Sequence, residues 1–126
     1  MSSVAKLMVW LAALVQLAFM IAEMGLWERY VAPKVAGYDP EVARITKPLG
    51  SNIGLYNGLL AAGLIASLYL PLQAGAWLAF YLAIFLLVAG VYGGVTVKKT
   101  IGIVQGGAGL LLLLALLAQS KVFAGG

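Results

Sequence analysis

The chain has 126 residues, of which 63% are hydrophobic and only 10% charged, with a formal net charge of +4 at pH 7. Soluble domains have about a quarter of their residues charged, so this composition excludes a soluble globular protein and indicates one small membrane domain. The sequence contains no cysteine and no histidine, which excludes disulfides, thiolate metal sites and the usual haem and zinc ligands. We therefore expect neither a metal site nor a cofactor.

Four apolar runs follow one another along the chain. An α-helix rises ~1.5 Å per residue and the hydrocarbon core is roughly 30 Å thick, so each run is long enough to cross a bilayer. We expect an all-α polytopic membrane protein, a four-transmembrane-helix bundle that forms a single domain over residues 1–126. The predicted spans are approximately residues 7–27, 51–70, 74–97 and 100–118.

The first run follows Lys6, just as the apolar region of a secretory signal peptide follows a basic region. It continues to Leu26, however, and Trp27, Glu28 and Arg29 follow it in place of a small-residue cleavage site. We therefore expect this run to be the first transmembrane helix.

The first connection, residues 28–50, is the only one long enough to have structure of its own. Asp-Pro-Glu at residues 39–41 supplies an N-cap, a first-turn proline and a first-turn acid, which predicts a short interfacial helix over residues 39–45. We expect Lys-Pro at 47–48 to end that helix and Gly-Ser-Asn at 50–52 to cap the second span. The short helix is interpreted either as a connector or as a lid over a cavity on the cytoplasmic side.

Lysine and arginine are distributed unequally between the two sides of the predicted bundle. The first and third connections together contain six of them, whereas the other side has two, Lys6 and Lys121. The positive-inside rule places the six in the cytoplasm and both termini outside, in the cell (inner) membrane. The basic residues then set orientation and meet lipid, so we expect the lipid bilayer and no nucleic acid as a partner. The six are Arg29, Lys34, Arg44, Lys47, Lys98 and Lys99.

Glycines recur four residues apart in three of the spans. This spacing lets helix backbones approach closely in lipid, and it is first a signal for helix packing. The pattern does not decide whether these faces meet within one chain or between chains, so a homo-oligomer is among the expected partners. The packing glycines are Gly54, Gly58, Gly90, Gly94, Gly102 and Gly106.

Polar residues inside the spans cluster near the predicted cytoplasmic side. Counted along the helices, four of them lie in one layer ~6–9 Å below the boundary between the membrane and the cytoplasm. Two more lie just above this layer, and Gln16 extends the layer toward the middle of the membrane. Unpaired polar groups are costly in hydrocarbon, so these residues are the candidate ligand-binding set. The four are Glu23, Asn57, Tyr92 and Gln105, and the two are Asn52 and Thr96.

Three classes of function are compatible with this polar layer. The first is a protein that binds or carries a small, amphipathic or lipid-like molecule. The second is a structural or assembly protein in which the layer only fixes helix packing, as asparagine and glutamine often do in membrane bundles. The third and least favoured is an intramembrane isomerase with Glu23 as acid or base, because no second acid, nucleophile or metal set accompanies it. A channel is disfavoured because the outer half of the bundle is almost wholly apolar.

The central motif is residues 52–58, Asn-Ile-Gly-Leu-Tyr-Asn-Gly, with Glu23 before it and Val-Ala-Gly-Val-Tyr-Gly at residues 88–93 and Gln105 after it. In these motifs the chain resembles the DUF1304 family of small, uncharacterised integral membrane proteins, over nearly its whole length. The resemblance implies a four-helix membrane protein of bacterial type. It implies no activity, substrate or catalytic residue.

Overall fold

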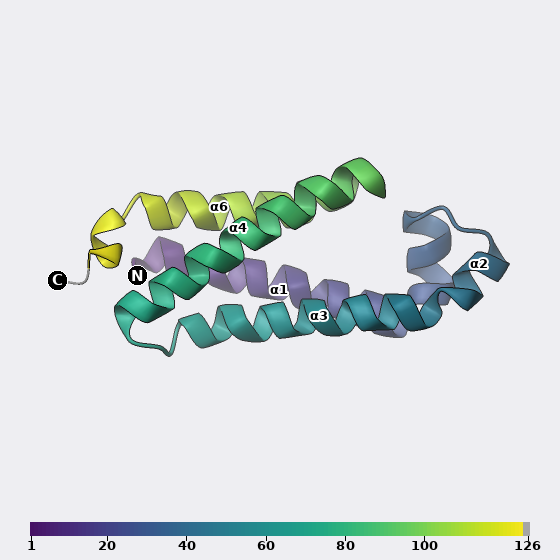
Figure 1. Cartoon of the computed structure of the whole chain (residues 1–126), viewed down its shortest axis with the longest axis horizontal. Coiled ribbons are helices and arrows are strands. Elements are labelled where there is room, and N and C mark those ends of the chain that lie inside the picture. The colour runs from purple at the N-terminus through teal and green to yellow at the C-terminus, as the bar shows by residue number, and fades with distance from the viewer. Residues whose placement is uncertain (125–126) are drawn as a thin grey trace.

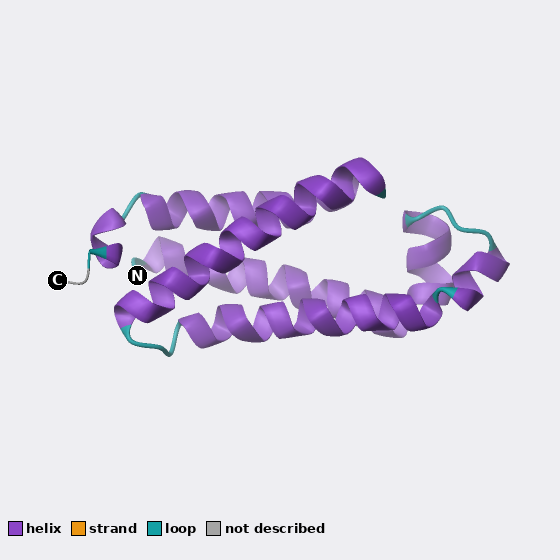
Figure 2. Ribbon diagram, in the orientation of Figure 1, coloured by secondary structure: helices purple, strands orange, loops and turns teal. Residues whose placement is uncertain are grey.

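A computed structural model describes residues 1–124, and every regular element in this part of the chain is helical (Figures 1 and 2). Four stretches are long and apolar enough to cross a membrane, which confirms the predicted all-α class and indicates a multi-pass membrane protein. They are α1 (Ser3–Gly25), α3 (Lys47–Ser67), α4 (Leu72–Thr96) and a composite fourth stretch, Lys99–Leu117. The composite stretch consists of α5 (Lys99–Ile101), η2 (Gly102–Gly106) and α6 (Gly107–Leu117).

The bundle is made of two closely packed pairs of helices. α1 packs along α3, and α4 packs along η2 and α6, while α1 also contacts α6 and joins the two pairs. Figure 1 shows α4 meeting α3 at their short connection and then running diagonally away from it. The core of the bundle is filled mainly by alanine and leucine side chains, and the small alanines let the helix backbones approach closely. Its largest fully buried apolar side chains are Val9, Leu64, Leu86, Leu112 and Leu116.

The N-terminus lies at one end of the bundle, together with the 3₁₀ turn η3 (Ser120–Phe123) near the end of the described chain (Figure 1). We call this the terminal end. The opposite end, which we call the loop end, contains the π-helix η1 (Trp27–Val35), the short helix α2 (Pro40–Ile45) and the turn between α4 and α5. All six basic residues of the first and third connections lie at the loop end.

The short helix in the first connection is confirmed, since the Asp39 side chain accepts a hydrogen bond from the backbone N–H of Val42 at 2.9 Å. The expectation that residues 50–52 cap the second span is wrong, because α3 begins at Lys47 and these residues lie within it. The N–H groups in the first turn of a helix have no partner within the helix, so the missing N–H of a proline costs nothing there. The φ angle of proline is also fixed near the helical value, so Pro48 helps to start α3. The second span is therefore displaced toward the N-terminus and ends at Ser67.

The π-helix η1 was not predicted from the sequence. Its first residue, Trp27, donates a hydrogen bond from Nε1 to Oγ1 of Thr46 at 3.0 Å, and its ring lies against Gly50 of α3. Near the other end of η1, Nζ of Lys98 donates to the backbone oxygen of Lys34 at 3.3 Å. These contacts hold η1 against both the start of α3 and the end of α4.

The fourth span was predicted as one α-helix, and the structure places the π-helical segment η2 in its first half. A π-turn takes in one residue more than an α-turn, so it changes the direction in which the residues that follow it point. π-Segments of this kind occur often at functional positions. Here η2 contains Gln105, one of the polar residues singled out above.

Candidate functional site

Four of the predicted polar residues form one chain of hydrogen bonds across three helical elements. Nε2 of Gln105 on η2 donates to Oε1 of Gln16 on α1 at 3.4 Å. Nε2 of Gln16 donates to Oδ1 of Asn57 on α3 at 3.0 Å. Nδ2 of Asn57 then donates back to Oε1 of Glu23 on α1 at 2.5 Å. We call these four residues the polar chain.

The spacing of the residues along α1 explains why the chain forms. Gln16 and Glu23 are seven residues apart, which is close to two turns of an α-helix, so both project toward α3. Asn57 lies between them on α3, on the face whose glycines allow α1 to come close. A β-carbon on Gly54 would lie 3.1 Å from Cβ of Glu23, and one on Gly58 would contact the side chain of Met20.

The polar chain has a consistent direction. Each of its three amides donates toward the next residue, and the last donor is bonded to the Glu23 carboxylate. Hydrogen bonds arranged in series polarise one another. A hydrogen bond to a carboxylate is stronger than a hydrogen bond to a neutral oxygen. The three amides therefore direct their N–H groups toward one carboxyl group.

Burial changes along the polar chain from its middle to its end. Gln16 has no exposed surface, and Asn57 and Gln105 are each 8% exposed. Glu23 is only half-buried. Among the described residues none donates to the second carboxylate oxygen, Oε2, and this oxygen is not enclosed. The chain thus ends in a carboxylate with one oxygen held by the protein and the other open.

The remaining three candidate residues do not join the polar chain. Tyr92 has 71% of its surface exposed, and Asn52 and Thr96 are also exposed. The hydroxyl of Thr96 donates to the backbone oxygen of Tyr92 at 2.7 Å. The expected convergence of Tyr92 with Glu23 is wrong because depth alone does not set direction. Tyr92 lies two residues beyond Gly90, which turns it by about 200° from the packed face of α4.

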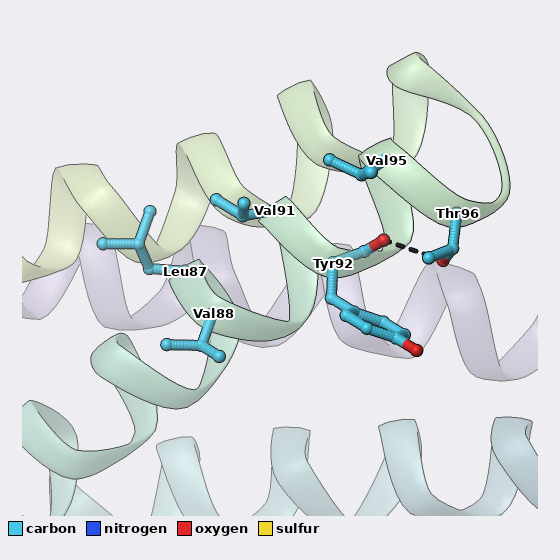
Figure 3. Close-up of a pocket in the computed structure, with 6 residues that line it drawn as sticks. All are labelled: Leu87, Val88, Val91, Tyr92, Val95 and Thr96. Carbon is cyan, nitrogen blue, oxygen red and sulfur yellow. Dashed lines mark hydrogen bonds between the residues drawn. The ribbon is translucent and has the colours of Figure 1, made fainter.

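Tyr92 instead lines an open hollow on one side of α4, which has a volume of about 420 Å³ (Figure 3). The other lining residues are Leu87, Val88, Val91, Val95 and Thr96, all from the same helix. Figure 3 shows the Tyr92 ring projecting on the side of α4 away from Val91 and Val95. A hollow on one helix that is almost entirely apolar is the kind of surface that lipid chains cover.

The predicted packing glycines lie at contacts between helices. Gly54 and Gly58 face α1, and the other four form two backbone contacts between α4 and η2. A β-carbon on Gly94 would lie 2.9 Å from Cα of Gly102, and Gly90 lies against Gly106 in the same way. These contacts occur within one chain. They bring η2 close to α4 at the level of Gln105.

A second polar feature at the loop end was not recognised from the sequence as a site. A hollow with a volume of about 500 Å³ is lined by Gly25, Trp27, Glu28, Arg29 and Lys47. The sequence analysis had assigned Arg29 and Lys47 to orientation and to general contact with lipid, and not to a binding site. The available signal was the position of two cations beside a tryptophan at the boundary of predicted spans. Only the tertiary structure brings residue 47 next to residues 25–29.

The described residues contain no group of three or more histidine, cysteine, aspartate or glutamate side chains that would hold a metal ion. The chemistry available at the polar chain is therefore hydrogen bonding and charge pairing by one carboxylate and three amides.

Comparisons with curated proteins and with solved structures find no significant match to the chain. The model of one protein family does match, over residues 10–117, which includes every member of the polar chain. That family is described as a protein of unknown function, DUF1304. With this match over most of its length, the chain belongs to the DUF1304 family.

Proposed function

We propose that the protein binds or carries a small amphipathic molecule whose polar head contacts Glu23 at the end of the polar chain. The open oxygen of the Glu23 carboxylate carries the proposal. Its partner oxygen is held by Asn57, so the carboxylate is already oriented before a ligand arrives. Such a group accepts a hydrogen bond from a hydroxyl, amide or ammonium head, and an intramembrane carboxylate is by default a functional candidate.

The rest of the bundle suits the apolar part of such a molecule. The helix surfaces beyond the polar chain are mainly leucine, isoleucine and valine with several tyrosine, tryptophan and phenylalanine side chains, and many of these side chains are exposed. An amphipathic molecule would therefore place its tail among these surfaces or in the surrounding lipid. The polar head would remain at the level of Glu23.

A structural role is the second candidate, and the complete burial of Gln16 favours it. Gln16 links two residues from two other elements, so the polar chain ties α1, α3 and η2 in one arrangement. Hydrogen bonds of this kind fix the register of membrane helices. In that case Glu23 would need only the shape of its side chain, because an amide accepts the same hydrogen bond from Asn57.

Substitution Glu23→Gln separates the two roles, with Glu41→Gln as a matched control at an exposed acid of α2. For a binding site we expect Glu23→Gln to leave thermal stability nearly unchanged while abolishing retention of a co-purified molecule or its pH dependence. Native mass spectrometry of protein released from gentle detergent measures both retained mass and oligomeric state. If Glu23→Gln retains the same molecules as the parent at every pH, the carboxylate is not part of a binding site.

We also propose that the loop end faces the cytoplasm and that both termini lie outside, in the cell (inner) membrane. The support is the charge distribution, with six basic residues at the loop end and Lys6 and Lys121 at the terminal end. Positive residues in short loops are retained on the cytoplasmic side during insertion. The polar chain would then open toward the cytoplasmic half of the bilayer.

A further inference from the structure

We infer that the hollow at the loop end, lined by Gly25, Trp27, Glu28, Arg29 and Lys47, binds a phosphate group. Two cations from different elements border it, Arg29 from η1 and Lys47 from the first turn of α3. This site is separate from the polar chain and uses none of its residues.

The two cations are available to a ligand. Neither ion pair in the described part of the chain includes Arg29. Nζ of Lys47 lies 3.8 Å from Oε1 of Glu28, which is beyond hydrogen-bonding distance, and both side chains are about half exposed or more, at 60% and 46%. An exposed pair at this separation is weak, so it opens readily for a stronger acceptor.

The walls of the hollow are fixed by contacts made elsewhere. The Trp27 ring is held by its hydrogen bond to Thr46 and by its contact with Gly50. At Gly25 a β-carbon would meet nothing within 4 Å, so space remains open between the end of α1 and Lys47. A phosphate placed there would be in reach of a planar guanidinium and a flexible ammonium, which together suit its geometry.

The position of the hollow indicates where the phosphate comes from. It lies at the end of a spanning helix beside a tryptophan, the residue that marks the boundary between hydrocarbon and headgroups. Lipid phosphates are concentrated at this depth, and basic residues next to a span attract anionic headgroups. The ligand is therefore the phosphate of an anionic phospholipid or a free phosphate, and the chemistry that recognises it is the same.

The test uses the full-length protein in detergent, titrated with phosphatidylglycerol and followed by native mass spectrometry. Dioleoylglycerol, which has the acyl chains but no phosphate, is the matched lipid. We expect Arg29→Gln and Lys47→Gln each to weaken binding of phosphatidylglycerol about tenfold, the loss of one charge-assisted hydrogen bond. The matched control is Arg44→Gln, which removes the same charge at the loop end but outside the hollow, and it should change binding little.

Glu28 gives a prediction of opposite sign. Glu28→Gln removes the carboxylate that competes for Lys47, so binding should tighten roughly two- to fivefold. Glu41→Gln removes the same charge from α2 and should not tighten binding. A general attraction between a positive surface and lipid would instead make the two glutamate variants equal.

The outcomes distinguish the sources and decide the proposal. If inorganic phosphate displaces phosphatidylglycerol, the phosphate group alone is sufficient for binding. If inorganic phosphate does not displace the lipid, but Arg29→Gln still binds phosphatidylglycerol more weakly than the parent, the ligand is a lipid headgroup. The proposal is overturned if Arg29→Gln and Lys47→Gln lose no more affinity than Arg44→Gln. Equal binding of dioleoylglycerol and phosphatidylglycerol would overturn it too.

Discussion

Gly90 of α4 and Gly106 of η2 meet backbone to backbone. A β-carbon on Gly90 would lie 2.3 Å from the nitrogen and 2.5 Å from Cα of Gly106, where real β-carbons essentially never come within 3.0 Å. Packing of this kind drives helix association in lipid, where burial from water contributes nothing. The same contact positions η2, and therefore Gln105, against the centre of the bundle.

Gly90→Ala should therefore destabilise the bundle. The new methyl group collides with backbone atoms, which cannot rotate away as a side chain can, and we expect a loss of about 1–3 kcal/mol in the free energy of unfolding. Gly107→Ala is the control on the fourth span, because a β-carbon there would meet nothing within 4 Å. Unfolding in a denaturing detergent measures both, and a Gly90→Ala protein as stable as Gly107→Ala would contradict the close contact.

The polar chain predicts an order of effects for substitution by leucine. Gln16 and Asn57 each make two hydrogen bonds in the chain, whereas Gln105 makes one. Hydrogen bonds between membrane helices average roughly 0.6 kcal/mol and rarely exceed ~1.7 kcal/mol, so Gln16→Leu and Asn57→Leu should each cost about 1 kcal/mol or more.

Gln105→Leu should cost about half as much, because a single bond is lost. The same detergent-unfolding measurement compares the three variants. A double substitution of Gln16 and Asn57 should cost less than the two single changes added together, since the two residues share a bond. Strictly additive costs would show that the bond contributes nothing to stability.

The proposed orientation is tested with introduced cysteines, because the native chain contains none. A membrane-impermeant thiol reagent added to intact cells should modify Ser3→Cys at the terminal end and leave Ala36→Cys at the loop end unmodified. Permeabilised cells provide the control, since Ala36→Cys should then react. The reverse pattern in intact cells would place the loop end outside and overturn the orientation.

The number and type of spans could be predicted from the sequence because they depend on local properties. A run of apolar residues long enough to cross hydrocarbon must be helical, since only a helix satisfies its own backbone there. The short helix after Asp39 was equally predictable, because its cap and its proline lie next to each other in the chain. The start of α3 was misplaced because a proline is compatible both with the end of one helix and with the first turn of the next. Local sequence rules do not decide which of the two roles Pro48 takes.

The candidate site was only partly predictable. Glu23, Asn57 and Gln105 were identified from their predicted depth in the membrane and Gln16 from its position on the same helical face as Glu23, and the structure joins all four. Tyr92 has a similar depth and lies elsewhere, because the direction of a side chain depends on which face of α4 packs against η2. The hollow at Arg29 and Lys47 depends on how residues far apart in the chain fold toward each other.

The sequence by itself determined that the chain has four segments long and apolar enough to cross a membrane, and which polar residues lie within them. The length of an apolar run and the free-energy cost of placing a polar group in hydrocarbon are properties of each segment alone. Neither depends on knowing the neighbouring helices. Only the tertiary structure decided which of these residues meet. The rotation of each helix is set by backbone contacts such as that between Gly90 and Gly106, which belong to pairs of helices and to neither member alone.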